Sequence, residues 1–262
     1  MIVIAGILAV IAAFVTTYVW ASVDAGREIA VDNPIVETVP PPPTTASNDE
    51  PTSTSSTLPE ILNESDLAKK VAGSVRAVQT LDEAGQRVEG TAFVVGSFGG
   101  QTYLLTSFAV VRANTKSPGP GITLNSNQRA TLWTWQEDRD LALLVVPGQI
   151  ESLAWAGLPP QKGEKIWAGG AGQKLAVGVV LTASETAIDH NIFVDDVRQG
   201  APIVNNRGEV LGMVSRVYNP NNRGTDSLYT AVPIRIACER MLRCGGGNTS
   251  AAAPATTSTT RR

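Results

Sequence analysis

The chain of 262 residues is 43% hydrophobic and 17% charged, so it can bury a sizeable core, although both of its ends differ in composition from its middle. Its net charge of -3, with no run of Lys or Arg outside the ends, disfavours nucleic-acid binding. The single histidine, His190, and the two cysteines are too few for a usual zinc site, so we expect no metal and no other cofactor.

Residues 1–23 are uncharged and almost wholly apolar. As a helix they would extend about 34 Å, enough to cross a hydrocarbon core of about 30 Å. A cleaved signal peptide would usually have a basic start and a shorter apolar core, and this segment has neither. We therefore expect a retained transmembrane anchor and a single-pass protein of the cell membrane.

The orientation of this anchor is set by two opposing features. Arg27 is the only basic residue near the span and would favour an internal position for the residues after the span. Residues 28–68, however, contain no Lys or Arg, and their composition suits an exported stalk. We expect the folded domain to be extracytoplasmic.

Residues 24–63 form a linker rich in Pro, Thr and Ser. The stretch TVPPPPTTASNDEPTSTSST at 38–57 has too few apolar residues to fold, and its prolines keep it extended, so we expect disorder. A short helix is expected after Asn63 or Ser65, either of which could cap it.

From residue 64 to residue 245 the pattern is that of one folded domain, and a disordered tail is expected at 246–262. Short apolar runs separated by turn residues predict an all-β barrel or sandwich. The expected strands are 74–80, 90–96, 101–106, 128–135 and 141–146, then 165–168, 175–183, 191–194, 201–204, 209–216 and 228–232. A helix is expected at 233–242, beginning at Pro233 and ended by three glycines.

Cys238 and Cys244 lie six residues apart, about 9 Å along a regular helix and too far for a disulfide unless the helix ends first. The glycines beyond Cys244 allow the chain to fold back. The alternatives are a disulfide, if the domain is outside the cell, and two separate thiols.

Six segments, in the order expected for one family, carry a resemblance. They are GTAFVV (90–95), LTSFAVV (105–111), DRDLALLVV (138–146), the strand within 161–170, RQGAPIV (198–204) and YTAVP (229–233). Together they resemble the chymotrypsin-like serine proteases in their bacterial trypsin-like, HtrA-type form. The resemblance implies two six-stranded β-barrels with a short C-terminal helix. We expect no PDZ-like region after them, which departs from the full HtrA layout.

The resemblance places the catalytic triad on Ala109, Asp140 and Gln199. Only the aspartate is retained, since the family has histidine at residue 109 and serine at residue 199. No Ser, Thr or Cys occurs from Ala187 to Val214. Without an imidazole to take a proton, a hydroxyl is a weak nucleophile, so the resemblance implies an inactive homologue. The amides at residues 197 and 199 would form the family's oxyanion hole and could still bind a carbonyl or carboxylate.

Few residues could substitute for the lost triad members. We expect His190 to be an exposed imidazole at a turn, and Ser107 to make a strand-end hydrogen bond. For Asp140 two alternatives remain, burial against backbone amides, Ser107, Thr106 or Gln199, and exposure beside Arg139. The charged Asp195, Asp196 and Arg198 are expected to be solvated, and Trp133, Trp135, Trp155 and Trp167 to pack in the core.

The sequence therefore predicts a membrane-anchored, catalytically inactive trypsin-like homologue that binds a peptide or protein partner. The binding residues would be Val197, Arg198, Gln199 and Gly200, with an extended segment laid along a strand edge. One alternative is an active serine endopeptidase with a non-standard site. Another is a structural brace in a membrane assembly.

Overall fold

A computed structural model of the chain describes residues 60–220 and 229–242. The expected membrane anchor at 1–23, most of the linker at 24–63, and the tail at 246–262 lie outside the described residues. Within the described ranges no helix is both long and apolar enough to cross a membrane.

Helix α2 (Glu64–Ser74) opens the domain, as the capping signal at Asn63 predicted. The Asn63 side chain accepts a hydrogen bond from the backbone amide of Asp66 at 3.0 Å, which satisfies one of the free donors of the first turn. Leu67 and Val71, four residues apart and therefore on one face of the helix, are buried. This face packs α2 onto the core shared by the two barrels.

Six antiparallel strands form the first barrel, closed in the order β1-β2-β3-β6-β5-β4. They are β1 (Val75–Leu81), β2 (Arg87–Phe98), β3 (Gln101–Ser107), β4 (Ile122–Leu124), β5 (Arg129–Gln136) and β6 (Leu141–Pro147). Five match the expected strands, and the sixth, the three-residue β4, is too short to show a periodic pattern. The interior is filled by aliphatic side chains such as Val94, Leu104 and Leu144.

The second barrel closes in the order β10-β11-β12-β9-β8-β7. Its strands are β7 (Lys165–Ala168), β8 (Ala176–Ala183), β9 (Ile188–His190), β10 (Pro202–Val204), β11 (Val210–Ser215) and β12 (Tyr229–Pro233). The expected strand at 191–194 is wrong, because the ladder ends at His190. There the Asn191 side chain accepts the hydrogen bond of the Val179 amide at 2.8 Å, in place of a backbone partner.

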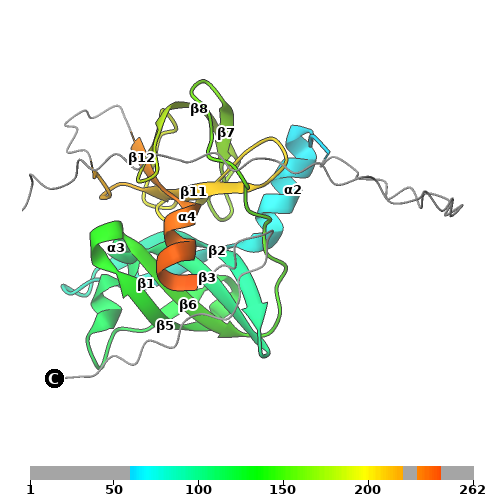
Figure 1. Cartoon of the computed structure of the whole chain (residues 1–262). Helices are drawn as coiled ribbons and strands as arrows, with labels where there is room; N and C mark the ends of the chain where they lie inside the picture. The colour runs from blue at the N-terminus through cyan, green and yellow to red at the C-terminus, as the bar shows by residue number, and fades with distance from the viewer. Residues whose placement is uncertain (1–59, 221–228, 243–262) are drawn as a thin grey trace, which may run out of the picture. The chain divides into compact units, whose positions relative to one another are not determined.

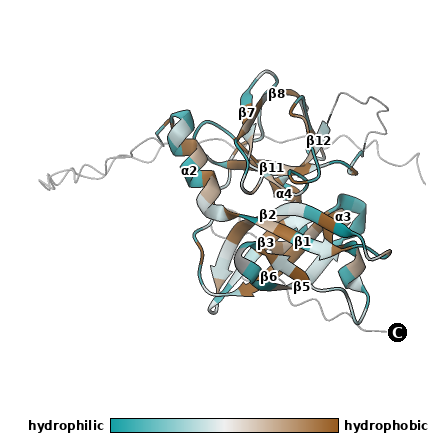
Figure 2. Cartoon of the chain, turned by 180° about the vertical axis from the view of Figure 1, so that it is seen from behind, coloured by the Kyte–Doolittle hydropathy of each residue, from teal (hydrophilic) through white to brown (hydrophobic). Residues whose placement is uncertain are grey.

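The two barrels share one continuous hydrophobic core, to which β2, β3 and β6 contribute from one side and β10, β11 and β12 from the other. Helix α4 (Ile234–Ala237) and the adjoining turn η5 (Cys238–Leu242) cross this boundary, as Figure 1 shows, and bury Ile236, Met241 and Leu242 there. Hydrophobic residues run along the strands, whereas α2 also carries hydrophilic ones on its outer side (Figure 2). The expected two-barrel fold with a short C-terminal helix is confirmed.

Cys238 is disulfide-bonded in the structure. Cys244, the other cysteine of the sequence, lies outside the described residues. The alternative of two separate thiols is therefore wrong for Cys238.

His190 is buried, not exposed at a turn as expected. Its Nδ1 accepts a hydrogen bond from the Ile192 amide at 3.2 Å, and its ring stacks on Tyr229 with centroids 6.2 Å apart. Its Nε2 is buried and makes no hydrogen bond to any described residue. Burial lowers the pKa of His190 from 6.5 to about 4, and the charge of Asp189 opposes this effect. The imidazole is therefore a neutral part of the second barrel.

The buried imidazole predicts a loss of stability in acid. The unfolded chain takes up a proton near pH 6.5, whereas the folded chain does so only near pH 4, so the free energy of unfolding falls as pH drops through this window. The difference amounts to about 3 kcal/mol. His190→Asn, whose amide oxygen can accept the Ile192 hydrogen bond, should show a flatter dependence between pH 4 and 6.5 in urea unfolding. Equal slopes in both proteins would contradict the assignment.

Candidate functional site

The residues that the resemblance assigns to the triad positions meet where the two barrels join. Ser107 ends β3, Ala109 lies in helix α3 (Phe108–Val111), and Asp140 directly precedes β6, all in the first barrel. Gln199 precedes β10 in the second barrel. The loop that carries Gln199 is tied across the boundary, because the Thr91 amide of β2 donates to the Gln199 carbonyl at 2.8 Å.

The hydrogen bond between this loop and β2 requires glycine at residue 200. Gly200 has a φ of 84°, in the left-handed region that side chains rarely adopt. A Cβ atom added there would lie 2.4 Å from the Thr91 carbonyl oxygen and 2.8 Å from the Ser107 amide nitrogen. The missing side chain thus lets the second barrel approach the backbone of the first.

Asp140 is buried, with 2% of its surface exposed. Its carboxylate accepts hydrogen bonds from the Ser107 hydroxyl at 2.7 and 2.8 Å, the Ala109 amide at 2.8 Å, the Gln199 side-chain amide at 3.1 Å and the Ser215 hydroxyl at 2.6 Å. The expectation that Ser107 and Gln199 hold Asp140 is confirmed, and exposure beside Arg139 is wrong. Thr106 does not take part, since its hydroxyl donates to the Thr91 carbonyl at 2.8 Å.

Gln199 is oriented by partners on both ends of its amide. Its oxygen accepts a hydrogen bond from the Arg216 amide at 2.8 Å, and its nitrogen donates to Ser107 Oγ at 2.7 Å as well as to Asp140. If the amide were reversed, its nitrogen would face the Arg216 amide, which is also a donor. Its oxygen would face the Asp140 carboxylate, which is also an acceptor. The Gln199 side chain is therefore held in one orientation, with its nitrogen against the Asp140 carboxylate.

Ser215 is the member of this cluster that the sequence did not reveal. It ends β11, one residue beyond the window from Ala187 to Val214 that lacks hydroxyl residues. Its hydroxyl also accepts the Tyr218 amide at 2.8 Å, so it fixes the turn that comes after the strand. The available signal was a serine at the end of a buried strand, which is also common in cores.

Burial raises the pKa of Asp140 above its ordinary value of 3.8. The hydrogen bonds from Ser215, Ser107 and the Ala109 amide, together with the charge of Arg112, oppose this effect. Desolvation disfavours the charged carboxylate, and the donors around it recover part of that cost. The carboxylate is thus satisfied within the protein.

Two hydroxyl groups lie against Asp140, yet neither is placed to attack a substrate. Ser107 and Ser215 have 0% and 1% of their surfaces exposed, and both donate their protons to the carboxylate. A carboxylate is a weak base toward an alcohol, in contrast to the imidazole of a serine protease. Ala109, at the position where the resemblance would place an imidazole, carries only a methyl group. The partners of His190 belong to the interior of the second barrel.

The loop from Val197 to Gly200 is held by hydrogen bonds to residues on either side of it and to β2. The Gln199 amide donates to the Asp196 carbonyl at 3.2 Å, and the Gly200 amide to the Val214 carbonyl at 3.0 Å. Thr91 Oγ1 donates to the Val197 carbonyl at 2.6 Å. The expectation that the amide at 199 could receive a ligand carbonyl is therefore wrong for this conformation.

The charges around this loop are only partly solvated. Arg198 and Asp195 form an ion pair of 2.8 Å whose side chains are 16% and 33% exposed, so the expected solvation is wrong for them. Asp196 is exposed, as expected, and pairs with Arg216. The Arg198 amide also donates to the Asp195 carboxylate at 2.8 Å, so both the backbone and the side chain of Arg198 are held by Asp195.

Two hollows run along the boundary between the barrels. One, of about 620 Å³, lies beside Gln199 and is lined by Arg87, Glu89, Ala109 and Arg216 among others. The other, of about 420 Å³, is lined by residues 137–140 and 217–220. Val217 lines both, with 58% of its surface exposed. We call the two hollows together the cleft.

The tryptophans are divided between surface and core. Trp133 and Trp135, expected in the core, are 42% and 43% exposed, because they lie on the outer side of β5. Trp167 is buried, and Trp155 packs against the core shared by the barrels, as expected.

Comparison with known proteins agrees with this geometry. Residues 90–213 match the family described as "Trypsin-like peptidase domain". The crystal structure of Deg5 is similar with a TM-score of 0.55 and 16% identity, over 70% of this chain and 96% of Deg5. That of the inactive form of the Rv3671c protease is similar with a TM-score of 0.50 and 17% identity, over 64% of this chain and 87% of that one. No curated protein matches the chain.

The contact between Gln199 and Asp140 can be tested with an isosteric charge. Gln199→Glu would place a second carboxylate about where the amide nitrogen now donates to Asp140, 3.1 Å away. We expect the free energy of unfolding to fall by about 3 kcal/mol at neutral pH, and by less as the pH is lowered, because a proton shared by the two carboxylates relieves their repulsion. Gln161→Glu, at an exposed position, is the matched control. Equal urea-unfolding curves for the two variants would contradict the described cluster.

Proposed function

From the premise that the described part of this chain is a trypsin-like peptidase domain, we propose that the protein is an inactive homologue that binds a peptide or protein partner in its cleft. The observation that carries the proposal is the Gln199 amide over Asp140, with Ala109 beside it. Together they occupy the place where nucleophile and base would act. We further propose that a membrane anchor holds the domain outside the cytoplasm.

Inactivity is expected from the chemistry that the site lacks. A serine protease needs a hydroxyl, a base that takes its proton, and amides that stabilise the oxyanion. Residue 199 supplies a carboxamide, residue 109 a methyl group, and the residue 199 amide is already bonded to Asp196. The alternative of an active peptidase would need a different nucleophile, and the two hydroxyls closest to Asp140 are buried.

Binding is supported by the shape and lining of the cleft. Val217 offers an exposed apolar side chain between the two hollows, and Arg87, Glu89, Arg216 and Asp196 supply charges of both signs. The amides of Arg216 and Val217 already donate to Gln199 and Ser215 within the domain. A bound segment would therefore depend on side-chain contacts and backbone carbonyls more than on a full strand ladder.

The extracytoplasmic assignment draws on two features. One is the apolar stretch at 1–23, and the other is the disulfide at Cys238, since disulfides persist mainly in oxidising compartments. Both fit a domain tethered to the outer face of a membrane.

The absence of turnover is the first consequence to test. The full chain should neither hydrolyse casein nor become labelled by a fluorophosphonate probe, because no described hydroxyl is both exposed to the cleft and next to a base. An active trypsin is the positive control for the probe. Labelling that disappears in Ser107→Ala or Ser215→Ala would support the peptidase alternative instead.

Partner binding is tested at Val217. A partner that can be crosslinked to the protein in the membrane should no longer be recovered with Val217→Asp. The substitution places a charge on the exposed apolar side chain between the two hollows of the cleft. Val177→Asp, at a position 46% exposed on β8, is the matched control and should retain the partner. Recovery of the same partner by both variants would favour the structural brace, in which the cleft has no role.

A further inference from the structure

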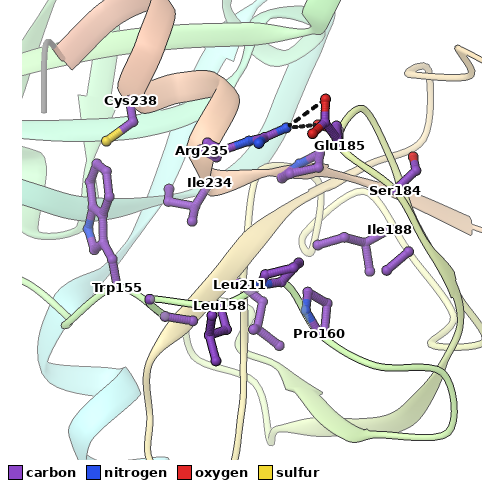
Figure 3. A pocket seen from close by; sticks show the side chains of 15 residues that line it. Trp155, Leu158, Pro160, Ser184, Glu185, Ile188, Leu211, Ile234, Arg235 and Cys238 are labelled. Atoms are coloured by element: carbon purple, nitrogen blue, oxygen red, sulfur yellow. Dashed lines mark hydrogen bonds and ion pairs between the residues drawn. The ribbon is translucent and has the colours of Figure 1, made fainter. Parts of the chain in front are cut away.

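A second pocket, of about 450 Å³, lies in the second barrel and shares no lining residue with the cleft. Its base is formed by the buried side chains of Ile188 from β9, Leu211 from β11 and Ile234 from α4 (Figure 3). Trp155 and Pro160 close it from the segment that connects the barrels. Its volume and apolar lining are typical of ligand sites.

The pocket is built from parts that are fixed in place. The connecting segment joins β11, since the Ala156 amide donates to the Val210 carbonyl at 3.0 Å and the Val210 amide to the Ala154 carbonyl at 2.8 Å. The residues of the base belong to strands of the closed barrel and to the helix directly after β12. A ligand would therefore enter a preformed site and would not need to order it first.

An apolar ligand would also shelter an exposed side chain. Leu158, at the edge of the pocket, is 80% exposed, the highest value among the large hydrophobic residues of the described part. An apolar group that filled the pocket would contact Leu158 and remove part of it from water, which favours binding.

The charges at the edge indicate which apolar groups fit. Of the lining residues, Arg235 and Glu185 are charged, and they pair at 3.5 Å. Arg235 also pairs at 3.6 Å with Glu239, which lies outside the lining, so the three side chains carry one positive and two negative charges. Figure 3 shows Arg235 and Glu185 together at one side of the pocket. Glu185 is 84% exposed and faces solvent. The excess negative charge complements a cation and disfavours an acidic ligand.

We propose that this pocket is a binding site for an apolar side chain that stands next to a basic residue in a segment of a partner protein. The apolar side chain occupies the space above Ile188, Leu211 and Ile234. The basic side chain lies at the edge, beside Glu185. This site is independent of the cleft and of the function proposed for it.

The test uses the full chain in lipid nanodiscs and three fluorescein-labelled peptides, Gly-Leu-Phe-Arg-Gly-Ser, Gly-Ala-Ala-Arg-Gly-Ser and Gly-Leu-Phe-Glu-Gly-Ser. Fluorescence polarisation should show the first binding best. The second should bind at least about tenfold more weakly, since the loss of even two buried methylene groups gives that factor. The third should bind about threefold or more weakly, as expected for one exposed ion pair.

Two surface variants locate the site. Leu158→Asp should abolish binding, and Glu185→Lys should reverse the preference between the arginine and glutamate peptides. Val177→Asp, on β8 and among the lining residues of neither the pocket nor the cleft, should leave binding unchanged. Equal binding of all three peptides, no binding of any, or no effect of Leu158→Asp would overturn the proposal. Self-association in sedimentation that Leu158→Asp abolishes would also overturn it, because the occupant would then be a second copy of the chain.

Discussion

The buried carboxylate of Asp140 is the constraint on which the joint between the barrels depends. Its donors come from both sides, Ser107 and the Ala109 amide from the first barrel, and Gln199 and Ser215 from the second. An unpaired carboxylate in this position would cost several kcal/mol. If the barrels moved apart, the carboxylate would lose some of these donors. This cost keeps the loop before β10 and the end of β11 in contact with α3 and β6.

Gln199 suits this position because its amide can donate twice and accept once. Its nitrogen serves both Ser107 and Asp140, and its oxygen takes the Arg216 amide, so all three groups are satisfied in the absence of water. A serine at residue 199 would be too short to take the place of the Gln199 amide against Asp140, and the side chain of residue 109 is a methyl group. In this geometry Gln199 and the Ala109 amide both donate to Asp140.

The sequence predicted the barrels because their strands alternate with clear turn residues, and because six motifs occur in order. The sequence-based prediction was wrong where side-chain hydrogen bonds take the place of backbone hydrogen bonds between strands. The ladder of β9 ends at His190 since the Asn191 amide oxygen takes over the next hydrogen bond, which no periodicity reveals. His190 was expected to be exposed, because its buried partners cannot be read from the sequence. These partners are the Ile192 amide and the Tyr229 ring, and the contact with Tyr229 depends on which strands pair. Ser215 was missed for the same reason, since its distance in sequence from Asp140 hides their contact.

Tyr218 shows how the wall of the cleft is kept in place. Its amide donates to Ser215 Oγ at 2.8 Å, and its hydroxyl donates to the Thr186 carbonyl at 2.6 Å while it accepts a hydrogen bond from Arg139 at 3.2 Å. The residue next to exposed Val217 is thus bonded to three separate parts of the domain. Such bonds lower the entropy that a surface side chain would lose on binding, because the backbone beneath it is already ordered. The exposed side chain of Val217 therefore stands on an ordered backbone at the cleft.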